Sequence, residues 1–214
     1  MAKTTAPFLG FGASGSVAKT LVASKWKGRS YVRQHVTPAN PNSSEQQLTR
    51  NTFSWLQAVW KVAPTLVQDV WTLFAKGKVL TNRNAFTKFN NGQLRTETDL
   101  TNLTLSPGAL GGLPATAVVA TPGSGQLSVA VTEPTVLPDG WTIASAIVAV
   151  IPDQNPQSAT LYNSFAGEDV SSPYTVVITG LDAVLYQVRA WLKWTRPDGS
   201  TAYSPDIATT GTPT

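Results

Sequence analysis

From about residue 114 to the C-terminus, apolar and polar residues alternate in short runs that are separated by Pro, Gly, Asp or Asn. Alternation with a period of two is typical of half-buried strands, and many short strands of this kind are typical of a β-sandwich. We expect seven strands, near Ala117–Thr121, Gln126–Thr132, Thr142–Ile151, Ser158–Tyr162, Tyr174–Thr179, Tyr186–Trp194 and Thr201–Ala208. This half is therefore predicted to be an all-β domain.

One expected strand departs from this alternation. Residues 143–151, "IASAIVAVI", are apolar on both faces, and the strand at 186–194 places Trp191 on the side opposite Tyr186. A sandwich strand with water on one side should alternate, so another layer is expected to cover this sheet. We predict a subunit interface made by Val148, Val150 and Trp191, with Arg189 and Lys193 as a polar rim. The alternative is that the helical half of the same chain folds back over this face.

The first half begins with a predicted β-hairpin. Two β-leaning runs, "SVAKTLVASKW" and "RSYVRQHV", flank a short turn at Lys27-Gly28. In the second run Tyr31, Arg33 and His35 share one face, because side chains of a strand point alternately to its two sides. This face is therefore expected to be cationic and aromatic.

Helical periodicity follows the hairpin. Apolar residues recur at helical spacing from Leu48 to Trp60, then over about 65–76, and again near 84–91, with Pro64 between the first two segments. A cap at Ser43 or Ser44, with Gln46 or Gln47 returning the bond, is expected to start the first helix. The core of the three helices is expected to contain Trp55, Trp60, Trp71, Phe74, Phe86 and Phe89.

Charge suggests where the chain divides. Residues 1–108 contain 13 Lys and Arg and 4 Asp and Glu, whereas residues 109–214 contain 3 and 8, so the two halves carry +9 and −5. The Gly- and Pro-rich segment "SPGALGGLP" lies at the change. We therefore predict two domains: a β-hairpin with a small helical module (α+β) over 1–105, and an all-β immunoglobulin-like sandwich over 114–214, joined by a linker at 106–113.

The sequence offers few groups for catalysis. It has no cysteine and a single histidine, His35, and no phosphate-loop lysine follows the glycines of "GFGASGS". Five carboxylates lie in expected loops or turns, where solvated surface charge is the common case: Asp153, Glu168, Asp169, Asp182 and Asp198. We expect no enzymatic activity, no cofactor and no metal site.

No apolar run approaches the roughly 20 residues that span a bilayer, and the N-terminus does not have the pattern of a secretory signal. We therefore expect a soluble protein made in the cytoplasm, with no membrane partner.

The expected hairpin is the strongest candidate for a binding surface. It carries Lys25, Trp26, Lys27, Arg29, Tyr31 and Arg33. Basic groups interleaved with aromatic rings suit nucleic acid, but no known nucleic-acid module accompanies them. We predict instead that the segment docks on an acidic protein surface, and an ordinary solvated hairpin is the other alternative.

The first half resembles a family of small proteins found in bacteriophage and prophage genomes, several of which are regarded as virion structural proteins. The motifs that carry this resemblance, over about residues 10–95, are "WKGRSYVRQHVTPANPNSSEQQLTR", "FSWLQAVW", "DVWTLFA" and "NAFTKFN". The resemblance implies signature positions, none of them catalytic, at Gly28, Tyr31, Arg33, Pro38, Asn40, Pro41, Gln46, Arg50 and Trp71.

The segment "YTVVITGLDAVLYQVRAWLKW" resembles the fibronectin type III pattern, in which a Gly-Leu pair precedes a Tyr at the spacing of Leu181 and Tyr186. The resemblance implies that the Tyr buries its ring and bonds its hydroxyl to nearby main chain. Val131 stands where many members carry Trp, so another immunoglobulin-like subtype stays open.

Together these features predict a non-enzymatic structural component of a phage particle, as head decoration, collar or tail component, located in the virion. Its expected partners are other virion proteins and copies of itself. One alternative is adhesion to a host surface or glycan, for which the aromatic candidates are Trp141, Tyr162, Trp191 and Tyr203. A second alternative is nucleic-acid binding through the basic hairpin. Fold alone does not decide between these functions.

Overall fold

The computed structural model describes residues 15–17, 19–37, 39–40, 42–96, 98–157 and 163–214. The described residues form three antiparallel sheets and three helices, an α+β content. The chain forms two compact units, residues 1–42 and residues 43–214, and each is described by itself. This division differs from the predicted boundary at 106–113, which lies inside the second unit.

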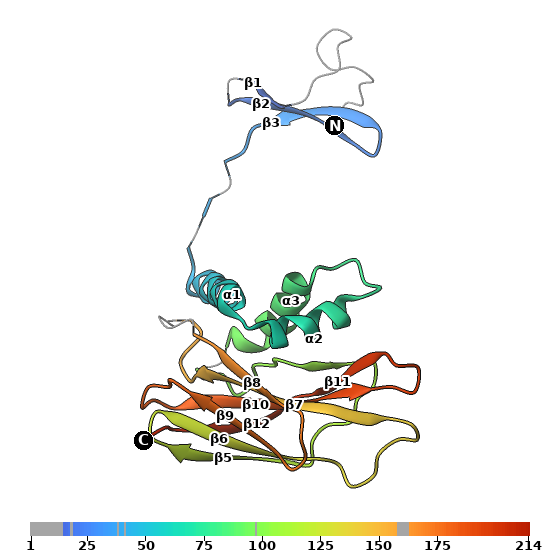
Figure 1. The fold of residues 1–214 in the computed structure, drawn as a ribbon. Coiled ribbons are helices and arrows are strands. Elements are labelled where there is room, and N and C mark those ends of the chain that lie inside the picture. Colours follow the sequence, from blue (N-terminus) through green and yellow to red (C-terminus); the bar gives the residue numbers. More distant parts are fainter. Residues whose placement is uncertain (1–14, 18, 38, 41, 97, 158–162) are drawn as a thin grey trace. The chain divides into compact units, whose positions relative to one another are not determined.

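The described part of the first unit is a three-stranded antiparallel sheet in the order β1 (Gly15–Val17), β2 (Leu21–Trp26) and β3 (Arg29–Gln34) (Figure 1). The predicted hairpin at Lys27-Gly28 is confirmed, because Trp26 pairs directly with Arg29. Both turn residues have positive φ angles, 47° and 79°. Two successive positive φ values suit a two-residue hairpin turn, since they follow the right-handed twist of the strands.

The second unit begins with three helices, α1 (Ser44–Val62), α2 (Thr65–Ala75) and α3 (Asn82–Leu94). The first two are separated as expected at Pro64, which lacks the N–H that a continuing helix would need. Ser43 is the N-cap of α1, but its side chain makes no capping hydrogen bond, so the predicted capping box does not form. At the start of α3 a side-chain cap does form, because the Thr81 hydroxyl accepts a hydrogen bond from the N–H of Asn84 at 3.2 Å.

Two sheets follow the helices. The larger runs β4-β11-β10-β7-β8, and β12 also pairs with β10; the smaller runs β5-β6-β9. Their bounds are β4 Pro107–Ala109, β5 Ala117–Gly123, β6 Gln126–Thr132, β7 Thr142–Pro152, β8 Phe165–Asp169, β9 Tyr174–Thr179, β10 Tyr186–Thr195, β11 Thr201–Pro205 and β12 Ile207–Gly211. Figure 1 shows three layers, with the helices over the larger sheet and the smaller sheet beneath it. The predicted strand at Ser158–Tyr162 lies outside the described residues.

The doubly apolar pattern of β7 follows from this layering. Ile147, Ala149 and Ile151 belong to the core shared with the helices. Val148 and Val150 belong to the core between the two sheets. A strand covered on both faces gains burial from every apolar side chain, so alternation is lost. The alternative in which the helices of the same chain fold over the sheet is therefore confirmed for the face of Trp191, whereas the smaller sheet covers the face of Val148 and Val150.

The expected aromatic core of the helices is confirmed except at Phe89, which is 37 % exposed. Trp55, Trp60, Trp71 and Phe86 are buried, and Phe74 is partly buried against them. The ring of Trp71 stands edge-on to the ring of Phe86, with centroids 5.5 Å apart. Edge-to-face pairs of this kind add to the stabilisation that burial provides.

The segment 106–113 packs on the sandwich. Ser106 is fully buried and donates to the carbonyl of Ser204. A Cβ atom at Gly112 would lie 2.7 Å from Cδ1 of Trp194, a distance too short for ordinary packing. The segment is therefore a packed connection inside the second unit, which is why no boundary forms there.

The expected position of Tyr186 is also confirmed. Its side chain is 2 % exposed, and its hydroxyl accepts a hydrogen bond from the backbone N–H of Asp182 at 3.1 Å. Leu181, also buried, belongs to the same core between the sheets. The bond ties the connection before β10 to the start of that strand.

Candidate functional site

The hairpin of the first unit gathers four of the predicted docking residues on one face. Trp26 lies opposite Arg29, and Tyr31 and Arg33 follow at alternate positions of β3. Residues that lie directly opposite each other in an antiparallel pair project to the same side. The face carrying Trp26, Arg29, Tyr31 and Arg33 is called the cationic–aromatic face below.

Trp26 is unusually exposed for its type. Its accessible fraction is 66 %, and the Lys27 ammonium group lies 4.9 Å from the centre of its ring. This accessible fraction already includes the neighbouring Lys27, so most of the Trp26 side chain stays available to a partner.

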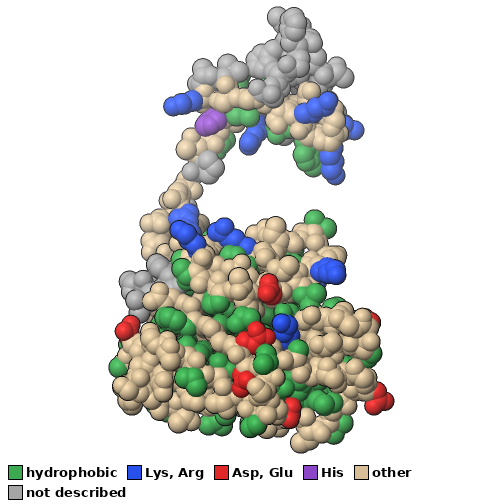
Figure 2. Space-filling model, viewed as in Figure 1, with side chains coloured by type: hydrophobic (Ala, Val, Ile, Leu, Met, Phe, Trp, Pro, Cys, Tyr) green, Lys and Arg blue, Asp and Glu red, His purple; other side chains and the backbone are tan. Residues whose placement is uncertain are grey.

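The first unit carries charge of one sign only. Residues 1–42 contain six Lys and Arg and no Asp or Glu, whereas residues 43–214 contain 10 and 12. Figure 2 shows the Lys and Arg side chains gathered on the strands of this unit. An approaching acidic surface would therefore meet no local repulsion there.

Two predicted docking residues lie off the cationic–aromatic face. Lys25 pairs with Ser30 and projects from the opposite side of the hairpin, together with the buried Ala23. Lys27 lies in the turn. The structure therefore groups two arginines with two aromatic rings, and leaves Lys25 on the opposite face and Lys27 in the turn.

The predicted interface of Val148, Val150 and Trp191 is not a surface. All three side chains have no accessible area in the chain itself. Trp191 belongs to the core under the helices, whereas the two valines belong to the core between the sheets. The register explains this separation, because Trp191 pairs with Ile147 and the next pair along is Ala190 with Val148.

The predicted polar rim of Arg189 and Lys193 is wrong at Arg189. Arg189 is 6 % exposed, and its guanidinium Nη2 donates to the carbonyls of Leu100 at 3.0 Å and Thr101 at 2.5 Å. Burial lowers the pKa of Arg189, and the charge of Asp206 opposes this shift. Lys193 is partly exposed and lies 3.6 Å from Oε1 of Glu168.

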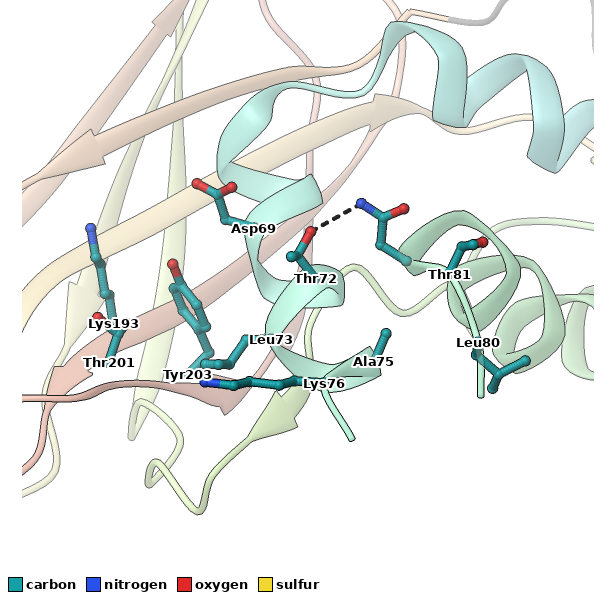
Figure 3. Close-up of a pocket in the computed structure, with 11 residues that line it drawn as sticks. Asp69, Thr72, Leu73, Ala75, Lys76, Leu80, Thr81, Lys193, Thr201 and Tyr203 are labelled. Atoms are coloured by element: carbon teal, nitrogen blue, oxygen red, sulfur yellow. Dashed lines mark hydrogen bonds between the residues drawn. The ribbon is translucent and has the colours of Figure 1, made fainter. Parts of the chain in front are cut away.

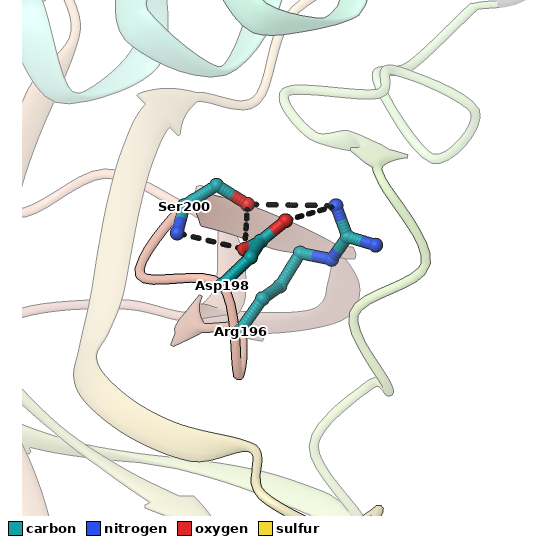
Figure 4. Close-up of polar contacts among 3 residues, drawn as sticks. All are labelled: Arg196, Asp198 and Ser200. Atoms are coloured by element: carbon teal, nitrogen blue, oxygen red, sulfur yellow. Dashed lines mark hydrogen bonds and ion pairs between the residues drawn. The ribbon is translucent and has the colours of Figure 1, made fainter.

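Two of the turn carboxylates have structural partners. Asp198 accepts from the N–H of Ser200 at 2.9 Å and from its hydroxyl at 2.5 Å, and it pairs with Arg196 at 3.5 Å (Figure 4). These bonds lower the pKa of Asp198. Asp169 likewise accepts from the N–H groups of Thr175 and Ser171, and its pKa is lowered. Both carboxylates are ionised hydrogen-bond acceptors, a state unsuited to donating a proton near neutral pH. Asp169 is the last residue of β8, so its predicted place in a loop is wrong.

The second unit contains a cleft that sequence reasoning did not find. It has a volume of about 730 Å³ and lies between α2, the start of α3 and strands β10 and β11 (Figure 3). Its residues come from segments more than 100 positions apart, so no local motif predicts it. The lining residues are Asp69, Thr72, Leu73, Ala75, Lys76, Leu80, Thr81, Asn82, Lys193, Thr201 and Tyr203.

The aromatic residues considered as sugar platforms are mostly covered. Trp191 is fully buried and Tyr203 is 6 % exposed. Trp141 is half-buried, with its ring edge-on to Trp194 at 6.1 Å and under the guanidinium of Arg196 at 5.5 Å. Tyr162 lies outside the described residues. No exposed ring therefore offers a stacking surface among the described members of this set.

Comparisons with known proteins identify no family. No family model matches the sequence, and no curated protein matches it. A solved structure titled "Myokine structure" has 14 % sequence identity and a TM-score of 0.33, over 48 % of this chain and 98 % of that chain.

Within the described ranges, no group of three or more His, Cys, Asp or Glu side chains is placed to hold a metal ion. None of the helices described is both long and apolar enough to cross a membrane.

Proposed function

We propose that this chain is a non-enzymatic structural component of a phage particle, which docks through the cationic–aromatic face of its first unit. The observation that carries the proposal is the combination of charge and exposure on that unit. It has six basic residues, no acidic residue and a Trp that is 66 % exposed. A soluble sheet gains no stability from such a ring, whereas interfaces are enriched in Trp, Tyr and Arg.

The separation of the two units supports an assembly role. Residues 43–214 have their own cores, and residues 1–42 form a distinct unit. A small charged module joined to an independently folded body can bind a neighbour without disturbing that body. The partner would be another virion protein, or another copy of this chain, with an acidic surface.

For the second unit we propose an immunoglobulin-like sandwich of the fibronectin type III kind. The strand order supports it, since β5-β6-β9 packs against a sheet that contains β8-β7-β10-β11. The bond between Tyr186 and the Asp182 N–H supports it as well, because such a tyrosine corner recurs in these folds.

The docking proposal is tested by reversing charge on the cationic–aromatic face. The double variant Arg29→Glu and Arg33→Glu should sediment with phage particles far less than the wild-type chain when it is produced with their other structural proteins. Each exposed ion pair contributes only about 0.2–1 kcal/mol, so both arginines must be changed.

The matched control reverses two exposed helix cations, Lys61→Glu and Lys88→Glu, which alters net charge equally. It should sediment with particles as the wild-type chain does. Equal recovery of the wild type and both double variants would refute the docking role.

Nucleic acid is the rival partner for the same face, because the register places two aromatic rings among two arginines. The two readings differ in their response to nuclease. If the chain binds a protein, its recovery with particles survives nuclease digestion. If it binds single-stranded nucleic acid, the purified chain shifts a fluorescent oligonucleotide on a gel, and the shift weakens steeply with salt.

A further inference from the structure

The outer edge of β3 has no partner strand among the residues that the structure describes. The sheet of the first unit runs β1-β2-β3, so β3 lies at its edge. The strand is 6 residues long, pairs with β2 in one continuous register and contains no proline. A regular edge strand of this kind presents a row of main-chain N–H and C=O groups with which a further strand can pair.

The hydrogen-bonding pattern identifies the groups that point outward. The N–H of His35 donates to the carbonyl of Thr20 at 2.7 Å, from the end of one strand to the other. Positions that bond to the same neighbouring strand recur at every second residue of an antiparallel pair. The alternate residues Ser30, Val32 and Gln34 therefore direct their main-chain groups away from β2, toward the free edge.

Charge makes a second copy of this chain a poor occupant of the edge. Natural edge strands often carry basic side chains, which discourage pairing with copies of themselves. The first unit has six basic residues and no acidic one, so two such units placed edge to edge would repel each other. Arg29 and Arg33 are exposed and belong to β3 itself. The same charge favours a strand that carries carboxylates.

We propose that the edge of β3 accepts an acidic strand of the docking partner, which extends the sheet by one strand. This inference rests on the docking role proposed above and specifies its geometry. Residues of the added strand that lie opposite Arg29 and Arg33 would project to the cationic–aromatic face, where carboxylates would pair with the guanidinium groups. The partner therefore needs acidic residues at the spacing of these two arginines.

The other face of the sheet specifies the residues between these acids. Val32 pairs with Ala23, and both project to the side opposite the arginines. Leu21 lies on this side as well and is 38 % exposed, whereas Lys25 lies nearer the turn. Apolar residues of an added strand would lie beside Val32 and extend this apolar row. The expected partner segment therefore alternates, with acids on one face and apolar side chains on the other.

A fourth strand would also stabilise a unit that has little core of its own. Among the described residues of the first unit, Ala23 is the one buried apolar side chain. Small sheets gain stability from further strands and from a covered apolar face. Pairing at the β3 edge would supply the first and part of the second.

The test adds synthetic peptides to the full chain and follows backbone amide exchange by NMR. The probe is TEVTVET, in which both glutamates lie on one face of a strand, at the spacing of Arg29 and Arg33, and both valines lie on the other. At saturation, the outward amides of Ser30 and Val32 should exchange at least about tenfold more slowly. The amide of Tyr31 is already bonded to β2 and should change little.

Two control peptides separate strand pairing from charge. The first has the probe sequence with N-methyl groups on both valines, whose amides would donate to β3, so the charge is kept and the pairing is lost. The second, TKVTVKT, keeps the strand pattern and reverses the charge. We expect each control to bind at least about tenfold more weakly than the probe.

A matched pair of variants tests the edge itself. Val32→Pro removes an N–H that points away from β2, so the hairpin keeps its own hydrogen bonds. Val32→Ala keeps this N–H and shortens the side chain. The probe should bind Val32→Pro at least about tenfold more weakly than Val32→Ala. Slow exchange of the Tyr31 amide checks that the hairpin is intact in both variants.

Each contrary outcome has its own meaning. If the N-methylated peptide binds as tightly as the probe, strand addition is wrong and an acidic docking surface remains. If the lysine peptide binds as tightly, the preference for an acidic strand is wrong. The inference is also overturned if the probe does not bind, or if the outward amides are protected before any peptide is added, since the edge would then be paired already.

Two further provisions keep the outcomes distinct. If Val32→Pro disturbs the hairpin, the comparison of the probe with its N-methylated form decides on the wild-type chain. Sedimentation of the arginine variants with particles tests the docking role separately, so that role can fail or stand independently of strand addition.

Discussion

Arg189 on β10 donates a hydrogen bond from Nη2 to the backbone carbonyl of Leu100, at 3.0 Å and out of contact with solvent. Leu100 lies in the connection that follows α3, so one buried guanidinium ties the helical layer to the sandwich. Its Nε has no partner among the described residues. The buried Arg189 guanidinium is therefore stabilised by its two Nη2 hydrogen bonds and by the charge of Asp206.

Replacing Arg189 should be costly. Arg189→Met keeps much of the side-chain volume but leaves two carbonyls without their donor and removes the positive charge near Asp206, and we expect a loss of about 3 kcal/mol in the free energy of unfolding. Lys193→Met on the same strand breaks only a partly exposed ion pair and should cost less than about 1 kcal/mol. Urea denaturation of both variants measures the contrast, and equal losses would contradict a structural role for Arg189.

The helices and the larger sheet share one core, and this predicts where a protease cuts the chain. Proteinase K should cleave first in the connection between β3 and α1, and leave a fragment close to residues 43–214 that unfolds in one transition. The segment 106–113 should resist cleavage, because Ser106 is buried and Gly112 is packed against Trp194. Mass spectrometry of the first fragments identifies the site. Early cleavage at 106–113 would instead restore the boundary predicted from charge.

Much of the sandwich was predictable because its information is local. Alternation and turn residues placed β6 and β9 at their observed limits, and the spacing of Leu181 and Tyr186 predicted the bond to Asp182. Because β7 is apolar on both faces, the sequence correctly predicted that another layer covers this sheet. What the pattern did not contain was the identity of that layer, because any apolar surface satisfies it.

The division of the chain was less accessible to sequence reasoning. Charge and Gly-Pro content marked 106–113, but the contacts that bury this segment come from residues about 90 positions away, such as Ser204 and Trp194. The cleft escaped for the same reason, since Asp69 and Tyr203 meet only in the folded chain. On the hairpin, strand periodicity alone predicted that Tyr31 and Arg33 share a face. The register between β2 and β3 then added Trp26 to that face.

Trp191 provides a direct test of the covering layer. Trp191→Ala should lower the free energy of unfolding of the 43–214 unit by about 3–5 kcal/mol, the usual cost of truncating a fully buried aromatic side chain. Val177→Ala, on the outer face of β9 where the side chain is 51 % exposed, should change stability by less than about 0.5 kcal/mol. A Trp191→Ala protein that melts like the wild type would place this side chain at an interface between subunits.

Asp206 and Asp198 should respond to pH in opposite directions. Burial raises the pKa of Asp206, although Arg189 and backbone N–H groups oppose the shift, whereas the bonds from Ser200 lower the pKa of Asp198. A raised pKa means that ionisation opposes folding, so the contribution of Asp206 is lost as pH rises above its ordinary value near 4. A lowered pKa means the reverse, so the contribution of Asp198 is present at neutral pH and is lost as pH falls through its folded-state pKa.

The corresponding variants remove each titration in turn. From pH 4 to pH 7, the stability of Asp206→Asn relative to the wild type should rise, because the variant has no charge to bury. From about pH 2 to pH 4 the relative stability of Asp198→Asn should fall as pH rises, since only the wild type gains the charged hydrogen-bond acceptor in that interval. Urea unfolding at four pH values, followed by Trp fluorescence, gives both slopes. Slopes of the same sign would show that the Arg189 charge outweighs the burial of Asp206 and that its carboxylate is stabilised in its ionised form.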